Sequence, residues 1–568
     1  MNSPLLLILL AVPTIGAIAG VFLPDRLARQ WALLVSVATF IISAILGVQF
    51  FCSDIDPGRV RFVFGPDRGD PGATYALAIP AIGFAFSLGV DSISVWLVLL
   101  TTLLTPLAIA ASFGSIKMRE KEYYAWMLAL LTAMLGVFVA RDLLLFYVFF
   151  ELTLVPMFFI IGIWGGPDRR TAAGKFFLFT FAGSVFTLAA VIYVGMNAGA
   201  GGRPSFDMDD VVRHAQSLEP YVRFWLLLGL LAGFAVKVPL FPVHTWLPLA
   251  HTEAPTAGSV ILAGVLLKLG TYGILRLALP IGLVNIASSP DAVAQIFGFD
   301  ITMPGVIKFM GLLCVIGIIY GALVAWVQQD IKKLVAYSSV SHLGFCVLGL
   351  LALNDEGMQG SVLYMINHGL STGAMFLVIG MIYDRYHTRD IDRLSGLAKI
   401  MPRLAFFFVL FTMSSIGLPP LNGFASEFLT ILGAFKSPHL GFGFGAFAAL
   451  GVILGAVYML HMTARVIWGP LKVPDVGHDH DAHTPAADAP AHGAAHAPAS
   501  NDIGPREIAI LTPLAILVVV LGVYAAGFLR PMRSPVQMIQ NGQTQTTYTA
   551  APAPPAPAPQ PAPLAARN

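Results

Sequence analysis

The segment that decides how this chain must fold is Phe234-Ala-Val-Lys-Val-Pro-Leu-Phe-Pro-Val-His-Thr-Trp246. It places Lys237 and His244 in a hydrophobic run, with Pro239 and Pro242 between them. A helix that enters a membrane about thirteen residues before the lysine rises ~1.5 Å per residue, which puts Lys237 roughly 20 Å into a ~30 Å hydrocarbon core. The prolines break this helix, and freed backbone within lipid must face protein or water. Because buried charges mark ion or proton routes, the segment predicts the centre of a transport path.

Composition points to a polytopic membrane protein. Of the 568 residues, 57% are hydrophobic and only 11% are charged. The first apolar run lacks the positive start of a signal peptide, so we read it as a transmembrane helix. Cys52, Cys314 and Cys346 indicate neither a disulfide framework nor a metal quartet. The net charge of +2 and the lack of phosphate-binding glycine motifs argue against nucleic-acid and nucleotide binding by this chain.

Fourteen apolar runs are long enough to span a membrane. They centre near residues 15, 44, 100, 131, 150, 188, 230, 265, 315, 348, 375, 411, 452 and 518. An even number puts both termini on one side. The alternate loops hold 18 Lys and Arg on one side and 13 on the other, and the richer side faces the cytoplasm by the positive-inside rule. We therefore expect a multi-pass protein of the bacterial inner (plasma) membrane with both termini in the periplasm.

The spacing of charges indicates an internal repeat. Glu151 precedes Lys237 by 86 residues, and His342 precedes Glu427 by 85. Each pair runs from an ionisable group inside a helix to a charge at a broken helix, because Gly417-Leu-Pro-Pro-Leu-Asn-Gly423 interrupts a second span. Five helices per repeat is an odd number, so the second copy is inverted in the membrane. The predicted fold is thus all-α, with fourteen transmembrane helices and two inverted five-helix repeats, each containing a broken helix.

This pattern divides the chain into six parts: helices 1–3 with an outer-face loop (1–120), the first repeat (121–281), the second repeat (305–470), a His/Ala/Pro-rich cytoplasmic loop (471–506), the last transmembrane helix (507–530) and a disordered Pro/Ala-rich tail (531–568). Around residues 59–64 the outer-face loop alternates as a strand would. Histidines of the cytoplasmic loop could bind metal, but its Ala and Pro residues favour a disordered linker without fixed geometry.

Five further ionisable groups lie at comparable depth on different helices. By the same count of residues from the membrane edge, they are Glu151, Lys268, His342, His368 and Glu427. Each could be an ion pair or hydrogen bond that holds helices together. Together with two broken helices, the set favours one polar file across the protein, parallel to the membrane, because lone charges in hydrocarbon are rare and costly.

The residues from Phe234 to Arg276 carry a family resemblance. They include His244-Thr-Trp-Leu-Pro-Leu-Ala-His-Thr-Glu-Ala-Pro-Thr256 and Gly264-Val-Leu-Leu-Lys-Leu-Gly270. The chain resembles the antiporter-like subunits of respiratory complex I, the M-chain family in particular, from about residue 88 to 528. The resemblance implies a proton-translocating subunit of an NADH:quinone oxidoreductase. It places FMN, the iron–sulfur clusters and quinone in other subunits, with L-type and N-type antiporter-like chains and the lipid bilayer as partners.

The resemblance also implies roles for individual residues. Glu151 and Lys237 would form the acid–base pair of a first half-channel, Lys268 and His342 would relay protons, His368 would be a further link, and Glu427 would lie on the outlet side. His244 would either join the relay or hydrogen-bond the helix break.

Two other functions stay open at this point. One is a subunit of a Mrp-type sodium/proton antiporter, which shares the Glu and Lys motifs. The other is a proton-inert structural subunit of the membrane arm. Glu427 argues against Mrp subunits and against the L and N chains, which usually have lysine there. Leu249 stands where those relatives often carry aspartate.

Overall fold

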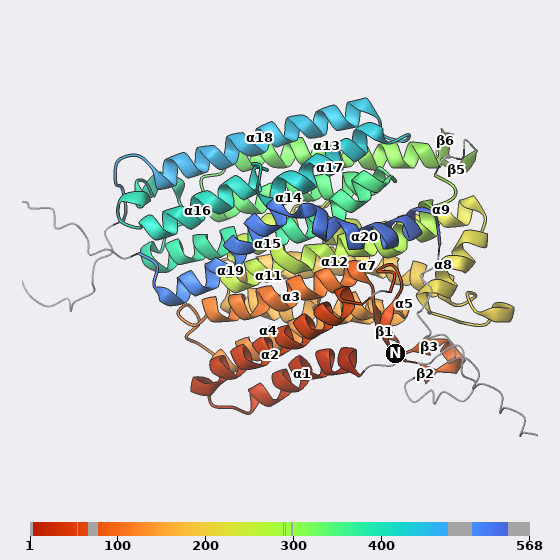
Figure 1. Cartoon of the computed structure of the whole chain (residues 1–568), viewed down its shortest axis with the longest axis horizontal. Coiled ribbons are helices and arrows are strands. Elements are labelled where there is room, and N and C mark those ends of the chain that lie inside the picture. Colours follow the sequence, from red (N-terminus) through yellow and green to blue (C-terminus); the bar gives the residue numbers. More distant parts are fainter. Residues whose placement is uncertain are drawn as a thin grey trace, which may run out of the picture.

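Long apolar runs become long helices that lie side by side, as Figure 1 shows for the computed structural model. The structure describes residues 4–53, 55–65, 78–287, 289, 291–296, 299–474 and 502–543. In its first half the helices are α1 (Leu5–Val21), α2 (Asp25–Phe51), α3 (Ser92–Ala111), α4 (Glu120–Val139), α5 (Leu143–Leu152), α6 (Leu154–Trp164), α7 (Arg169–Gly195), α8 (Met208–Ser217), α9 (Pro220–Lys237), α10 (Trp246–Glu253), α11 (Thr256–Ile261) and α12 (Leu267–Gly273). The second half has α13 (Met303–Trp326), α14 (Ile331–Leu351), α15 (Asp355–Tyr386), α16 (Pro402–Ser415), α17 (Asn422–Lys436), α18 (Phe442–Ile467), α19 (Pro505–Val523) and α20 (Ala525–Gln540).

Most of the predicted spans are present as single long helices. Within the described ranges, 12 helices are long and apolar enough to cross a membrane. Two shorter apolar helices, α1 and α16, occupy the other two predicted positions. The prediction of a polytopic helical membrane protein is confirmed. The count of fourteen spans and the inverted repeats stay predictions.

Short antiparallel strands gather at one end of the bundle (Figure 1). Strand β1 (Arg61–Phe64) covers most of the predicted strand and pairs with β4 (Leu88–Val90), while β2 (Ala78–Ile79) pairs with β3 (Phe84–Ala85). A further hairpin, β5 (Ala292–Ile296) with β6 (Phe299–Thr302), was not predicted from the sequence. All belong to loops that helix alternation assigns to the same face.

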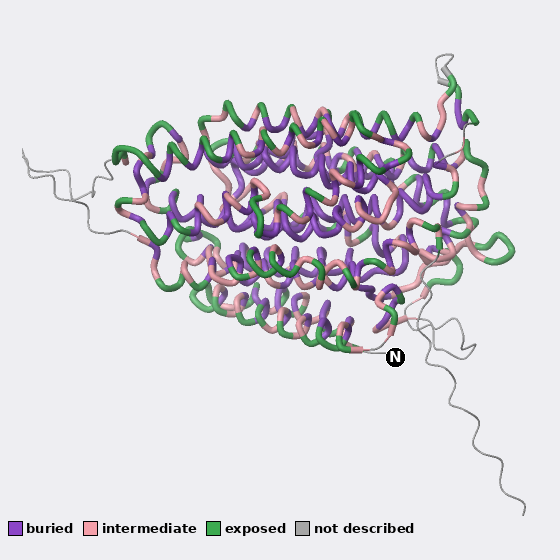
Figure 2. Tube along the Cα trace, turned by 45° about the horizontal axis from the view of Figure 1, so that its top comes forward, coloured by how far each residue is buried: buried purple, intermediate pink, exposed green. Residues whose placement is uncertain are grey.

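The most enclosed spans carry three of the predicted ionisable residues. Over their most apolar stretches, residues 256–283 and α14 are each 94% buried and α15 is 100% buried, whereas α18 and α19 are 33% and 28% buried. The continuous purple of the central helices in Figure 2 shows this difference. Lys268, His342 and His368 lie on the three enclosed spans, so protein and not lipid surrounds them.

The first predicted helix break is confirmed. Helix α9 ends at Lys237, and α10 begins nine residues later at Trp246. The carbonyl of Ala235 accepts from the amide of Leu240 at 3.0 Å, and the indole of Trp246 donates to the carbonyl of Val236 at 2.9 Å. Neighbouring groups therefore satisfy the backbone that the prolines release, as a break within a membrane requires.

The second break is confirmed between α16 and α17, where Asn367 donates to the carbonyl of Asn422 at 2.6 Å. The end of the chain differs from the prediction. Residues 531–540 are not a disordered tail, because α20 continues to Gln540. Its apolar residues Met532, Val536 and Ile539 recur at helical spacing and are buried, and this spacing outweighs the two prolines within the helix. The His-rich stretch 475–501 and residues 544–568 lie outside the described residues.

Candidate functional site

Lys237 occupies the end of α9, at the first break. Its side chain is 1% exposed, and its Nζ donates to the hydroxyl of Thr153 at 3.0 Å and lies 4.8 Å from the centre of the Phe150 ring. A cation at a helix C-terminus is stabilised by the helix dipole, and the aromatic face adds a further attraction. The break therefore holds a cation in the protein interior without a direct carboxylate partner.

Glu151 lies near this lysine without forming an ion pair with it. The side chains come from adjacent elements, and the charge of Lys237 acts on the carboxylate. Carboxylate oxygen Oε1 is buried and finds no hydrogen-bond partner among the described residues. Glu151 and Lys237, the predicted acid–base pair, are therefore not in direct contact in this structure, because the lysine donates to Thr153.

The second lysine is linked directly to a predicted histidine. Lys268 is 0% exposed, and its Nζ donates to the carbonyl of Ala263 and lies 2.7 Å from Nδ1 of His368. Residues Leu262–Leu266, which end two residues before Lys268, form a π-helical turn, a distortion often found at functional sites. The ammonium donates to His368 Nδ1, which assigns the neutral ring a proton on Nε2.

His342 and Glu427 are connected through a tyrosine. The hydroxyl of Tyr364 donates to Glu427 Oε1 at 2.9 Å and lies 2.7 Å from His342 Nδ1. Because the hydroxyl has one proton, His342 Nδ1 must be the donor to its oxygen. The hydroxyl of Tyr458, 3.4 Å from His342 Nε2, completes the ring's hydrogen bonding. A proton can therefore pass from His342 to Glu427 by two short transfers.

A small polar cavity joins the two linked groups. It measures about 10 Å³ and is lined by both His342 and His368, whose ring centroids lie 5.7 Å apart. That volume is close to the least that admits one water molecule. Lys268, His368, His342, Tyr364 and Glu427 are thus brought into one continuous cluster, hereafter the central file.

Gly417 allows the carboxylate to approach the second break. Its φ is +70°, which side chains rarely adopt, and a Cβ there would collide with Glu427 Oε2. The second break thus places its backbone directly against the Glu427 carboxylate.

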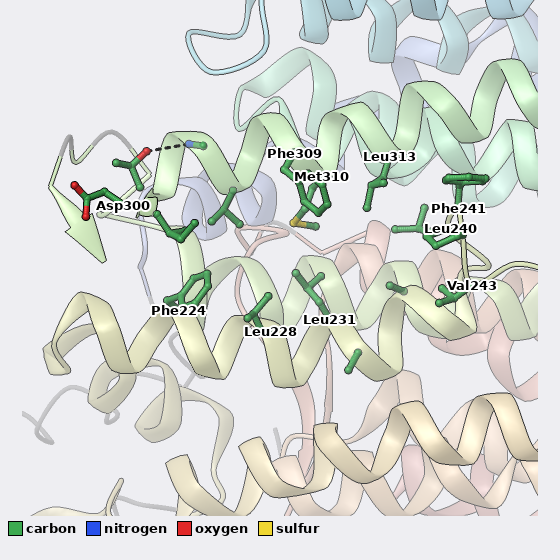
Figure 3. Close-up of a pocket in the computed structure, with 17 residues that line it drawn as sticks. Phe224, Leu228, Leu231, Leu240, Phe241, Val243, Asp300, Phe309, Met310 and Leu313 are labelled. Atoms are coloured by element: carbon green, nitrogen blue, oxygen red, sulfur yellow. Dashed lines mark hydrogen bonds between the residues drawn. The ribbon is translucent and has the colours of Figure 1, made fainter. Parts of the chain in front are cut away.

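His244 is not part of the central file. It is buried beside Phe241 and Tyr320, with ring centroids 5.7 and 5.3 Å away, and its Nδ1 has no partner within the described structure. The same break borders an apolar groove of about 690 Å³ between α9 and α13, which Figure 3 shows running from Asp300 to Phe241 and Val243. No residue of the central file lines this groove.

Sequence reasoning missed the hydroxyl groups that connect the predicted charges, namely those of Tyr364, Tyr458 and Thr153. One signal was available: Tyr364 precedes His368 by four residues, a spacing that places both on one helix face. Tyr458 and Thr153 carry no comparable signal, because an isolated tyrosine or threonine is ordinary in an apolar helix.

Comparisons with known proteins identify the family. Residues 140–454 match the family described as NADH:quinone oxidoreductase/Mrp antiporter, and residues 77–138 match the amino terminus of NADH-ubiquinone oxidoreductase chain 4. NADH-quinone oxidoreductase subunit M of Rhodobacter capsulatus is 41% identical over 88% of both chains. The chain belongs to the subunit M family of respiratory complex I. Chain 4 of Chondrus crispus is a further relative, 38% identical over 95% of this chain and 98% of its own.

Solved structures agree with this membership. A chain of respiratory complex I from Thermus thermophilus superposes with a TM-score of 0.78 at 27% identity, over 95% of this chain and all of that one. A chain of the Mrp complex from Dietzia sp. gives a TM-score of 0.77 at 22% identity, over 96% of this chain and 99% of its own, which shows a shared fold alone. The structural comparison therefore agrees with the sequence comparison: this chain has the antiporter-like fold.

Proposed function

We propose that this subunit moves protons across the membrane through the central file and the Glu151–Lys237 pair, while quinone is reduced elsewhere in the complex. The observation that supports the proposal best is the run of contacts from Lys268 through His368, His342 and Tyr364 to Glu427. A set of structural ion pairs would not need this continuity, because each charge could be satisfied separately by the nearest neighbour.

The proton steps follow from the hydrogen bonds. Lys268 Nζ gives a proton to His368 Nδ1, and His368 releases its Nε2 proton toward His342 through the shared cavity. A proton that reaches His342 Nε2 makes the ring cationic, and the Nδ1 proton then passes to the Tyr364 oxygen. Tyr364 in turn gives its hydroxyl proton to Glu427. Tyr364 ends as it began, with one proton, so each passage delivers one proton to the carboxylate.

The first half of the route works as an electrostatic switch. At ~4 Å and an effective dielectric constant of ~20, a lysine and a carboxylate attract by about 4 kcal/mol. About 1.36 kcal/mol corresponds to a tenfold change in an equilibrium constant. Closing or opening the pair therefore changes the proton affinity of Lys237 by roughly 10²–10³-fold. The open arrangement, with Lys237 on Thr153 and Glu151 Oε1 unpartnered, supplies one of the two states that such a switch needs.

The wider setting follows from family and sequence. The subunit acts within a translocating NADH:quinone oxidoreductase, beside L-type and N-type chains, in a bacterial inner membrane with both termini in the periplasm. Redox cofactors are assigned to other subunits. Among the described residues no group of three or more His, Cys, Asp and Glu side chains is placed to hold a metal ion. The pair Glu427 and Leu249 argues against the Mrp alternative.

Two experiments test the proposal. Purifying the native assembly from membranes should recover flavin and iron–sulfur subunits with this chain, whereas recovery of small membrane subunits alone would favour a Mrp antiporter. In vesicles that contain the whole complex, Lys268→Met should abolish most NADH-driven proton uptake with the complex still assembled on native gels. Proton uptake at the wild-type rate would contradict the proposed route and favour a proton-inert structural subunit.

A further inference from the structure

His251 is a buried histidine for which the proton route above has no use. It lies on α10, two residues before the end of that helix, and is 0% exposed. Neither of its ring nitrogens has a hydrogen-bond partner within the described structure, although a ring with two polar atoms is rarely buried without one. Its ring stacks in parallel on the ring of Phe376, with centroids 4.7 Å apart.

The stack places His251 beside a helix face that leads to the central file. His368, Phe376 and Tyr383 follow one another on α15 at spacings of eight and seven residues, about two turns each, so they lie along one face. By a rise of ~1.5 Å per residue, Phe376 is about 12 Å from His368 along the axis and about 10 Å from Tyr383. His251 therefore lies about halfway along this face.

The far end of this face opens into a second polar pocket. It measures about 210 Å³, room for several water molecules, and Tyr383 forms part of its wall. Its charged lining comes from Glu253, Lys332, Asp384 and Arg389. The loop before α7, the start of α14 and the end of α15 surround it, and helix alternation assigns these ends to the cytoplasmic face. We refer to this cavity as the Lys332 pocket.

The segment that carries His251 is held firmly between the pocket and the file. Lys332 donates to the carbonyl of Ala254, Arg389 to the carbonyl of Thr252, and Ser259 to the carbonyl of His251 itself. The charges of both Lys332 and Lys268 act on the ring. These hydrogen bonds fix the backbone on both sides of His251, which keeps the ring between the Lys332 pocket and Lys268.

We propose that His251 carries protons from the Lys332 pocket to Lys268, which makes it the uptake residue of the central file. The inference rests on the proposed function. An imidazole can bind a proton from pocket water on one nitrogen and release the proton of its other nitrogen toward Lys268 along a short chain of water molecules. The Phe376 stack keeps the ring in place throughout, and the proton count balances, with one bound and one released.

The test compares variants of His251 in vesicles that contain the whole complex. His251→Phe keeps the stacking and removes the proton-binding atoms, and His251→Gln keeps a polar, hydrogen-bonding side chain that does not titrate. Both should lower NADH-driven proton uptake at least about tenfold, since a positioned acid–base group typically contributes 10²–10⁴-fold. His461→Phe, the same change at an exposed position of α18, should leave uptake unchanged.

Assembly and Lys268→Met, measured in parallel, separate the outcomes. Wild-type uptake by either assembled His251 variant would overturn this inference. If His251→Phe does not assemble, proton uptake by His251→Gln alone tests the inference. Loss of uptake in Lys268→Met with wild-type uptake in the His251 variants would refute only the assignment of His251. Wild-type uptake in Lys268→Met would refute the proposed function itself.

Discussion

Removing one hydroxyl should interrupt the central file. In Tyr364→Phe the ring keeps its place in α15, but His342 and Glu427 lose the group that joins them at 2.7 and 2.9 Å. The remaining separation, 3.6 Å between His342 Nδ1 and Glu427 Oε1, is too long for a hydrogen bond. Direct transfer of a proton to the carboxylate then requires the two side chains to move toward each other.

The size of the effect follows from the lost hydrogen bonds. A hydrogen bond to a charged group contributes about 1.5–3 kcal/mol. If its loss raises the barrier to proton transfer from His342 to Glu427 by about 2–3 kcal/mol, that transfer slows roughly 30- to 150-fold. We expect proton uptake to fall by this order when the transfer limits turnover, with NADH oxidation by coupled vesicles falling in parallel.

The assay is dye-monitored proton uptake into vesicles beside NADH oxidation, with assembly checked on native gels. Tyr386→Phe is the matched control, because Tyr386 lies on the same helix and its hydroxyl contacts only the sulfur of Met401, at 3.7 Å, among its described partners. Uptake by Tyr364→Phe equal to that of Tyr386→Phe would refute the bridging role of the hydroxyl.

Three further predictions concern the carboxylate at the second break, the orientation in the membrane and the packing at the first break. Glu427→Asp should keep more proton uptake than Glu427→Gln in equally assembled complexes, since only a titrating group can receive the proton from Tyr364, and equal uptake would show that none is needed. A reporter fused within residues 486–499 should be active only as a cytoplasmic reporter, and a periplasmic signal would overturn the proposed orientation. Gly270→Ala should destabilise the subunit by about 1–3 kcal/mol and impair assembly, because its Cβ would lie 2.6 Å from Val238 and 3.1 Å from Lys237 Cβ. Gly174→Ala, which meets nothing within 4 Å, should assemble normally, and equal behaviour of the two glycine variants would contradict the packing argument.

The sequence alone predicted the features that carry a large energetic cost. Lys237 and Glu427 could be found because charges within apolar runs are rare and because two prolines must break a helix. The breaks lie where those residues placed them. The grouping of Lys268, His342 and His368 could be expected from depth, but their order of contact depends on how the helices are rotated, which the sequence does not specify.

Interactions that involve little energetic cost could not be predicted from the sequence. Tyr364 and Thr153 look like ordinary apolar-helix residues, and only the fold reveals that their hydroxyls touch charged groups. The family resemblance implied an acid–base pair of Glu151 and Lys237, but in the structure the lysine donates to the hydroxyl of Thr153. In α20, two prolines concealed a helical pattern of apolar residues, because proline is a strong local signal and packing along a helix face is not local.

The most direct test of proton transport through this chain is the ratio of protons taken up to NADH oxidised in the Lys237→Arg variant. Arginine keeps the positive charge at the break but does not release its proton at any physiological pH. If Lys237 loads and releases protons, the assembled variant should lose most of its proton uptake, nearly as much as Lys237→Ala. If Lys237→Arg pumps like the wild type, the lysine is a fixed counter-charge and the switch at the first break does not exist.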